Sequence, residues 1–206
     1  MPAVSSWSCM VTAWKSTSEA TRMTSAAMSP NARAPARVRL RPTMTSDLDY
    51  VLSLEQDPAN LPFITPWERT QHEAAIRFPD FRHFIIEAGA GLDAAGFVIL
   101  IGCRSPHQSI ELKRMVVQDK GLGYGRAALR VAKKVAFDDL GAHRFWLDVK
   151  ERNARAQNLY QTEGFALEGR LRDAVRVAGG RDSLIVMSML ATEFAGRRAQ
   201  GREMFA

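Results

Sequence analysis

The chain has 206 residues, of which 46% are hydrophobic and 24% are charged, an ordinary composition for a globular protein. No run of about 18 apolar residues occurs, which excludes a transmembrane helix. Two cysteines are too few for a disulfide framework or a four-ligand zinc site, and such sparse cysteine predicts a reducing, cytoplasmic location. Lysine and arginine number 28 against 22 acidic residues, a net charge of +6. This excess fits nucleic acid, a membrane surface or a phosphate-rich cofactor as partner, and it fits equally a charge that only keeps the protein soluble.

The N-terminal segment, residues 1–36, differs from the rest of the chain. It is rich in Ser, Thr and Ala, contains Glu19 as its only acidic residue and has no helical or strand period. This composition predicts a disordered leader. An organellar transit peptide has the same character, and so has a segment translated from a start site assigned too far upstream. We expect the folded domain to cover residues 37–195, followed by a flexible tail at 196–206.

Hydrophobic periodicity predicts eleven elements between these ends. Their order is one strand, two helices, three strands, then helix, strand, helix and two closing strands, which indicates a mixed α/β fold in a single domain. The predicted strands cover residues 38–41, 83–88, 96–101, 109–117, 144–149, 165–171 and 184–190. The predicted helices cover residues 46–56, 65–78, 123–140 and 154–163.

Capping residues predict where the helices begin and end. Ser46 is the expected N-cap of the first helix. Thr65 and Glu68 have the spacing of a capping box, with Pro66 at the first helical position. Gly164 is expected to end the last helix, because glycine adopts the left-handed conformation of a C-cap without strain.

A glycine loop joins the strand at 109–117 to the helix at 123–140. Gly121, Gly123 and Gly125 leave their backbone N–H groups unshielded, and the helix start that follows carries a partial positive charge. Strand, glycine loop and helix N-terminus together predict a phosphate cradle. A tight turn that needs positive φ is the simpler alternative, although three alternating glycines exceed what a turn requires.

Two known phosphate-binding motifs are alternative interpretations of this loop, and the sequence argues against both. A P-loop is excluded, because no Gly-Lys-Ser/Thr follows the glycines. A dinucleotide site is a real competitor, since Gly123, Gly125 and Ala128 satisfy G-x-G-x-x-A and Asp148 follows twenty residues later. The strand before the loop, however, carries three charged residues, and only one further strand–helix unit follows. Both observations argue against a doubly wound parallel sheet.

The helix after the loop carries a basic stripe. Arg126, Arg130, Lys133 and Lys134 are spaced i, i+4, i+7 and i+8 and so share one face. A solvated face is the ordinary explanation. Beside a phosphate cradle, Arg126 is also expected to reach the ligand, with Arg130 as a second candidate.

Residues 118–129 and 143–165 resemble the two signatures of the GNAT superfamily of N-acetyltransferases. The family's loop pattern, Arg/Gln-x-x-Gly-x-Gly/Ala, corresponds to Lys120-Gly121-Leu122-Gly123-Tyr124-Gly125, with lysine in the first position. The second pattern, Asn-x-x-Ala-x-x-x-Tyr-x-x-x-Gly-Phe, is matched by Asn153, Ala156, Tyr160, Gly164 and Phe165. In these motifs the chain resembles the ribosomal-protein alanine acetyltransferase branch, and the resemblance extends over about residues 38–193.

The resemblance implies a fold and a cosubstrate. The fold is a central, mostly antiparallel twisted sheet, with a parallel strand pair splayed at the cofactor site and helices on both faces. The cosubstrate is acetyl-CoA, and no metal is implied. Its pyrophosphate would lie on the loop and its pantetheine arm along the preceding strand. The cofactor-binding residues implied in this way are Met115, Val116, Val117, Lys120, Gly121, Leu122, Gly123, Tyr124, Gly125, Arg126 and Asn153.

Acetyl transfer to an amine needs a base, donors for the developing oxyanion and an acid for the leaving thiolate. Tyr160 is the candidate acid, and a core tyrosine that packs the helix on the sheet is the alternative. Asn153 has the position of a helix N-cap, a role that is compatible with cofactor binding.

Two carboxylates compete as the base, Glu111 and Asp148, and neither is a third alternative. For each of them a surface ion pair, with Lys113 or Lys150 respectively, is the simpler explanation. Regular alternation would put Glu111 on one face with Met115 and Val117, but a β-bulge in this strand would reverse the faces downstream.

The remaining expectations concern partners and alternative functions. The acceptor is a primary amine, on a small molecule or at a protein N-terminus; neither nucleic acid nor membrane is expected, and the chain is a candidate homodimer. A non-catalytic acyl-CoA-binding module of the same fold and a nucleotide-dependent oxidoreductase are the competing functions. The four histidines show no metal spacing and are expected at the surface or at strand ends.

Overall fold

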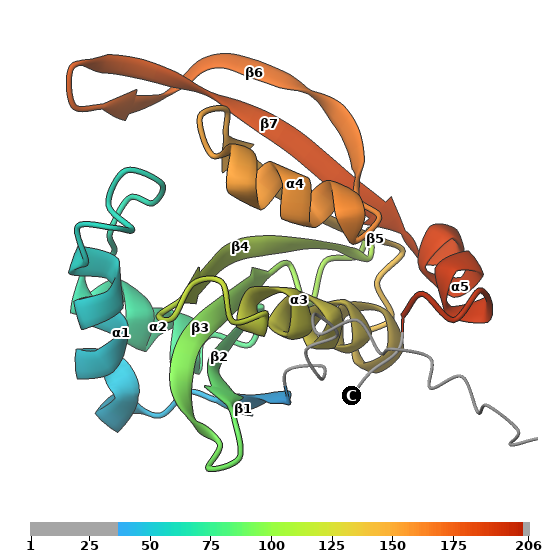
Figure 1. Ribbon diagram of the computed structural model, residues 1–206, viewed down its shortest axis with the longest axis horizontal. Helices are drawn as coiled ribbons and strands as arrows, with labels where there is room; N and C mark the ends of the chain where they lie inside the picture. Colours follow the sequence, from blue (N-terminus) through green and yellow to red (C-terminus); the bar gives the residue numbers. More distant parts are fainter. Residues whose placement is uncertain (1–36, 204–206) are drawn as a thin grey trace, which may run out of the picture. The chain divides into compact units, whose positions relative to one another are not determined.

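The computed structural model describes residues 37–203; the predicted leader at 1–36 and the last three residues of the predicted tail lie outside them. Figure 1 shows the arrangement of the elements. The strands are β1 (Val38–Pro42), β2 (Phe81–Ala88), β3 (Asp93–Ile101), β4 (Ser109–Val117), β5 (Arg144–Lys150), β6 (Ala166–Val177) and β7 (Gly180–Leu190). The helices are η1 (Thr45–Asp47), α1 (Leu48–Gln56), α2 (Arg69–Arg77), α3 (Tyr124–Lys134), η2 (Val135–Asp139), α4 (Ala154–Thr162) and α5 (Ala191–Ala199). None of the helices in the described part of the chain is long and apolar enough to cross a membrane.

The strands form one seven-stranded sheet in the order β1-β2-β3-β4-β5-β7-β6. Every neighbouring pair is antiparallel except β4 and β5. This is the predicted mixed α/β fold, with a mostly antiparallel sheet and one parallel pair at its centre. The parallel pair joins a β1–β4 half to a β5–β7–β6 half.

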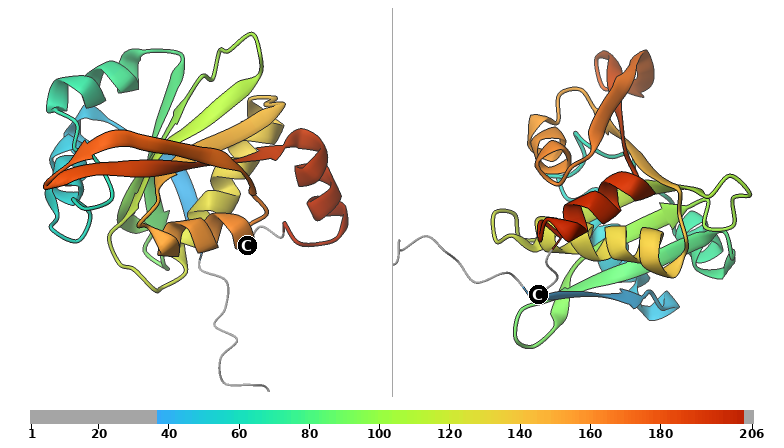
Figure 2. Two further views of the ribbon diagram at one scale, coloured as in Figure 1. Left: turned by 90° about the horizontal axis from the view of Figure 1, so that it is seen from above. Right: turned by 90° about the vertical axis from the view of Figure 1, so that its right-hand side faces the viewer.

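Helices lie on both faces of the sheet (Figure 2), and apolar residues pack between them and the strands. On one face α3, α4 and α5 pack on a large core that includes Leu129, Phe145 and Phe194, which we call the α3-side core. On the other face α1 and the segment before α2 pack on a smaller core that includes Val51 and Phe97, which we call the α1-side core. The expectation of helices on both faces is confirmed.

The starts of the first two helices differ from the prediction. Ser46 is not the cap of α1, because a 3₁₀ turn precedes the helix and Asp47 Oδ2 accepts the Met44 N–H at 2.7 Å. The second helix begins at Arg69, and Gln71 Oε1 accepts the Glu68 N–H at 2.8 Å. Side-chain acceptors three residues inside each turn therefore satisfy these N–H groups.

The C-terminal part of the chain is more ordered than the sequence indicates. Strands β6 and β7 extend over 12 and 11 residues, well beyond the predicted closing strands. The predicted loose tail begins inside α5, which runs to Ala199, and the Glu203 side chain is buried against Lys133 on α3. The reason is a tertiary contact. Phe194, the buried residue of α5, stacks on Phe137 with the two ring centroids 4.7 Å apart.

Candidate active site

The glycine loop has the conformation that an anion cradle requires. Gly121 and Gly123 have φ of +91° and +87°, in the left-handed region that other residues enter only with strain. Gly123 is the N-cap of α3 and provides no side-chain cap, so the first N–H groups of the helix have no such partner. A Cβ added at Gly121 would meet nothing within 4 Å. The loop therefore presents bare backbone, at the positive end of a helix, to open space.

The parallel strands beside this loop separate after a short pairing. Ser109, Ile110 and Glu111 pair with Arg144, Phe145 and Trp146, and the ladder goes no further although both strands continue. Beyond Glu111 the edge of β4 that faces β5 has no strand partner. An extended ligand can therefore form backbone hydrogen bonds along residues 115–117, as the resemblance implies.

A β-bulge lies where the strands separate. Ile99 of β3 pairs with Arg114 and its neighbour Leu100 pairs with Leu112, which leaves Lys113 as the extra residue. A bulge increases the local twist and bends its strand, so it accounts for the divergence of β4 from β5.

The bulge also changes which residues share a face. Upstream, Leu112 belongs to the α3-side core; downstream, Met115 and Val117 pack against that same core, and Val116 belongs to the α1-side core. Glu111, which alternates with Leu112, is thus on the face opposite Met115 and Val117. Regular alternation had put these three together and is wrong here, whereas the reversal expected from a bulge is confirmed.

The two candidate carboxylates lie on the α1 side of the sheet. Glu111 is in register with Trp146, and Asp148 follows Trp146 by two residues on the same face, since Leu147 and Val149 enter the α3-side core. Glu111 forms an ion pair with Lys113 at 3.0 Å, the simpler role considered for it. Lys150 does not pair with Asp148, because its ammonium group donates to the Pro62 carbonyl at 3.0 Å.

Tyr160, on α4, belongs to the α3-side core, on the other face of the sheet from the two carboxylates. Its side chain is 8% exposed and its ring lies 5.8 Å from that of Phe165, so it packs the helix on the core. Burial and the negative charge of Asp148 raise the pKa of Tyr160, which keeps the phenol protonated at neutral pH. The hydroxyl forms no hydrogen bond within residues 37–203. A core role and an acid role are therefore compatible in this residue.

Side chains of several predicted cofactor-binding residues contact the protein instead. Asn153 Oδ1 accepts the Ala156 N–H at 3.2 Å and so caps α4. Lys120 Nζ donates to the Ala59 carbonyl at 3.2 Å, and Arg126 forms an ion pair with Glu163 at 2.8 Å. At Asn153 and Lys120 mainly the backbone is left to bind a ligand, whereas Arg126 uses only one guanidinium nitrogen in its ion pair.

Sequence reasoning missed a buried polar network on the α1 side. Glu55 of α1 is fully buried and accepts hydrogen bonds from Arg114 of β4 and from the Trp67 N–H. His72 Nε2 lies 3.4 Å from the same carboxylate. Arg114 also donates to the Thr65 carbonyl at 2.8 Å and stacks over Trp67. The network attaches the helices of the α1 side to the strand that leads into the glycine loop.

Two of the histidines continue this network. His72 Nδ1 lies 3.0 Å from His83 Nε2, and His83 Nδ1 lies 2.8 Å from Thr43 Oγ1. Both histidines are buried, so a surface location is wrong for them, while His83 lies near the start of β2, in line with the strand-end alternative. Although burial opposes it, His72, Arg114 and the Trp67 amide hold the pKa of Glu55 below its usual range. Burial and His72 lower the pKa of His83 to about 4.

Comparison with known proteins identifies the family. The acetyltransferase (GNAT) domain family matches residues 37–166. The chain belongs to this family. It is therefore an acyltransferase of a family whose cosubstrate is acetyl-CoA, as expected. No cluster of His, Cys, Asp and Glu suited to a metal ion occurs within residues 37–203.

The individual relatives share about a third of their residues or fewer with this chain. Spermidine N(1)-acetyltransferase of Vibrio cholerae is 28% identical over 117 residues, 56% of this chain and 67% of that protein. An uncharacterized N-acetyltransferase of Mycobacterium tuberculosis is 34% identical over 101 residues, 47% of this chain and 64% of the relative.

Solved structures share the fold over most of the chain. A chimera of the V. cholerae spermidine N-acetyltransferase SpeG and hSSAT has a TM-score of 0.71 at 25% identity, and the match covers 78% of this chain and 99% of the chimera. The V. cholerae enzyme in complex with CoA and spermine has a TM-score of 0.70 at 24% identity, and covers 77% and 98%.

The low pKa of His83 predicts an acid sensitivity of the fold. The unfolded chain binds a proton on this histidine near pH 6.5, and the folded chain only near pH 4. The stability that His83 provides is thus present above pH 6.5 and is lost as the pH falls towards 4, about 2 kcal/mol between pH 7 and 5. Urea unfolding at several pH values measures how the free energy of unfolding depends on pH in wild type and in His83→Gln. This dependence should be weaker in the variant, which lacks the titrating histidine. His107→Gln, at an exposed position, is the control, and an unchanged pH dependence in His83→Gln contradicts the assignment.

Proposed function

We propose that this protein is an acetyl-CoA-dependent N-acetyltransferase that transfers the acetyl group directly to a primary amine of a small molecule, in a ternary complex. The observation that carries the proposal is the parallel β4–β5 pair that opens after Glu111, beside a glycine loop in which Gly121 faces open space. An extended arm and a phosphate group can be bound there by backbone alone. These are the two chemical features that CoA presents.

The cofactor side is formed by the loop and the end of β4. A Cβ at Gly125 would lie 3.6 Å from Val117 and 3.9 Å from Leu159, so strand, loop and α4 meet at the start of α3. The N–H groups of residues 121–126 are suited to the pyrophosphate, and the free edge at 115–117 to the pantetheine arm. Acetyl-CoA supplies the activated acetyl group. A backbone N–H of this edge is the expected donor to its carbonyl oxygen.

The acceptor side is the α1 face of the sheet. Glu111 and Asp148 together attract a cationic amine there, and one of them, directly or through water, takes the proton that the amine must lose. Asp148 is close enough to raise the pKa of Tyr160, which connects the two sides of the site. Tyr160 is the proposed donor of a proton to the leaving thiolate.

The acceptor itself is proposed from chemistry and from the relatives. Two carboxylates on one face suit an alkylammonium, and one relative is named for spermidine. We therefore propose a small di- or polyamine as the acceptor. We prefer it to a protein N-terminus, which is the acceptor of the alanine acetyltransferase branch. The cytoplasmic location and the homodimer stay part of the proposal; one solved relative is described as dodecameric.

A screen of acceptors tests the function. Purified protein is incubated with acetyl-CoA and a panel of monoamines, polyamines, amino acids and peptides, and thiol release is measured. We expect the highest rates with di- or polyamines. CoA binding without thiol release for any amine would favour the non-catalytic acyl-CoA-binding module instead.

A matched glycine pair tests the cradle. Gly121 and Gly179 both have left-handed φ, +91° and +83°, with open space where a Cβ would point, but Gly179 lies in the distant β6–β7 turn. Alanine at either position costs roughly 1–2 kcal/mol of backbone strain. Gly121→Ala should also weaken CoA binding at least tenfold by calorimetry, because its methyl group blocks approach to the N–H groups. Equal CoA affinity of the two variants would exclude the cradle. Lys120→Ala should weaken CoA binding less than Gly121→Ala does.

Tyr160→Phe tests the acid. The change removes only a hydroxyl that has no hydrogen-bond partner within residues 37–203, so melting temperature and CoA affinity should hold. The rate should fall by about 10²-fold, equivalent to roughly 2.7 kcal/mol of barrier, and the loss should appear in kcat rather than KM.

Tyr50→Phe is the matched control for Tyr160→Phe. Tyr50 has a fully enclosed hydroxyl without a hydrogen-bond partner in the described part of the chain, and its removal should leave kcat unchanged. A stability loss with normal kcat in Tyr160→Phe would reduce Tyr160 to a core residue.

A further inference from the structure

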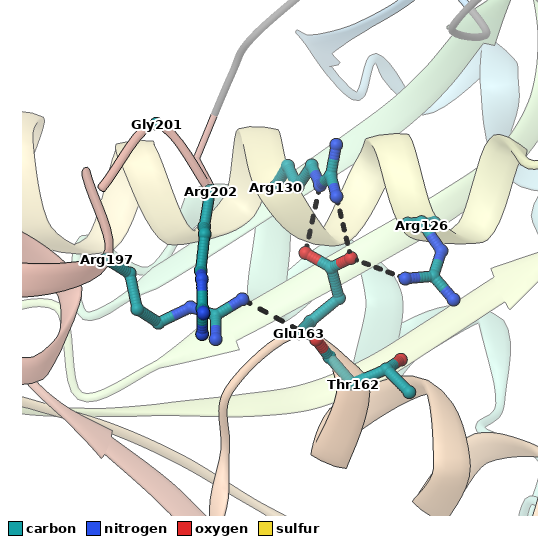
Figure 3. Close-up of a pocket in the computed structure, with 7 residues that line it drawn as sticks. All are labelled: Arg126, Arg130, Thr162, Glu163, Arg197, Gly201 and Arg202. Atoms are coloured by element: carbon teal, nitrogen blue, oxygen red, sulfur yellow. Dashed lines mark hydrogen bonds and ion pairs between the residues drawn. The ribbon is translucent and has the colours of Figure 1, made fainter. Parts of the chain in front are cut away.

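A cavity of about 470 Å³ lies on the far side of α3 from the α1-side network, and arginines dominate its lining (Figure 3). They come from α3, from α5 and from the segment after α5, while the end of α4 closes the cavity. The lining residues are Arg126, Arg130, Thr162, Glu163, Arg197, Gly201 and Arg202.

Glu163 holds two of the cavity's arginines in place. Its carboxylate is fully buried and accepts from Arg130 through two nitrogens, at 2.9 and 3.0 Å, and from Arg126 at 2.8 Å. Although burial alone would raise it, Arg130 and Lys133 hold the pKa of Glu163 below its usual range. The basic stripe of α3 is therefore not simply a solvated face, and two of its arginines are held in place around one carboxylate.

The cavity nevertheless contains more positive charge than its acids neutralise. Besides these groups, Arg197 and Lys133 share Glu203, at 2.7 and 2.6 Å. Five cationic side chains thus face two carboxylates. Arg202 pairs with no carboxylate within residues 37–203, although it lines the same cavity.

Arg197 is held against the cavity wall by a glycine. A Cβ at Gly164, which has φ of +95°, would lie 2.6 Å from the Arg197 guanidinium carbon, so a larger residue there would displace this side chain from its present position. Arginines held in fixed orientation, with N–H donors still free, suit a planar or tetrahedral oxyanion.

We propose that this cavity binds a phosphate monoester dianion, with Arg202 and the free donors of Arg126 as its principal contacts. Arg197 and Arg202 lie beyond residue 166, where the family match ends, so the site depends on this chain's own C-terminal segment. Two sources have this chemistry: the 3′-phosphate of CoA and a free phosphorylated metabolite. The first rests on the proposed function and is favoured by position, because Arg126 directly follows Gly125 of the glycine loop.

Calorimetry with CoA and 3′-dephospho-CoA, in a buffer without phosphate, tests the first source. Wild type should bind CoA at least tenfold more tightly than 3′-dephospho-CoA, and Arg202→Ala should lose most of this preference. Arg126→Gln should reduce it too, which keeps the test valid if the Arg202 variant does not fold. Arg202→Lys should retain part of the preference through its charge. Arg176→Ala, an exposed arginine of β6, removes the same charge outside the cavity and should change nothing.

Inorganic phosphate as the only ligand tests the second source. Phosphate should raise the melting temperature of wild type, but not of Arg202→Ala or Arg126→Gln. If the two CoA forms bind equally while this shift persists, the cavity takes a free anion. If neither CoA form binds, the proposed function fails and the phosphate measurement still decides on the cavity. A preference and a shift that are both independent of Arg202 and Arg126 would overturn the proposal.

Discussion

The parallel contact between β4 and β5 is short, and the rest of the structure depends on where it stops. Each strand is held by an antiparallel neighbour on its other side, β3 or β7, so the sheet survives although its centre opens. The opening begins at the bulge, and the glycine loop follows at the end of the same strand. Helices α3 and α4 cover the opening from one face, and the two candidate base carboxylates lie on the other. In the proposed function, this single interruption of the ladder gives the cosubstrate and the acceptor separate approaches to one point.

Two buried carboxylates secure the helices on either side of this opening. Glu55 attaches α1 and the start of α2 to β4 through Arg114, and Glu163 attaches the end of α4 to α3 through Arg126 and Arg130. Buried charges are costly unless they are paired and hydrogen-bonded, so each carboxylate fixes several partners at once. Fixed partners keep the walls of the site in position while its interior stays open.

Local patterns in the sequence predicted the features that depend on local conformation. The left-handed glycines at 121, 123 and 164 follow from spacing alone, and so do most strand centres. A bulge in β4 could be expected, but its position at Lys113 could not be predicted, because it exists only relative to the register of β3. Nor could the burial of His83, whose partners Thr43 and His72 are brought together by the packing of β1 and α2 on β2. The extent of the ordered C-terminus depends on Phe137 and Lys133, more than fifty residues upstream.

The bulge at Lys113 bears on the balance between stability and activity. Lys113 is exposed, and its removal would restore regular alternation without turning any neighbour to the other face. A straightened β4 could then continue its ladder with β5 and satisfy backbone groups that are now free. If the opening holds the cosubstrate as proposed, a deletion of Lys113 would thus exchange binding space for backbone hydrogen bonds. The bulge is then a local irregularity that trades stability for function.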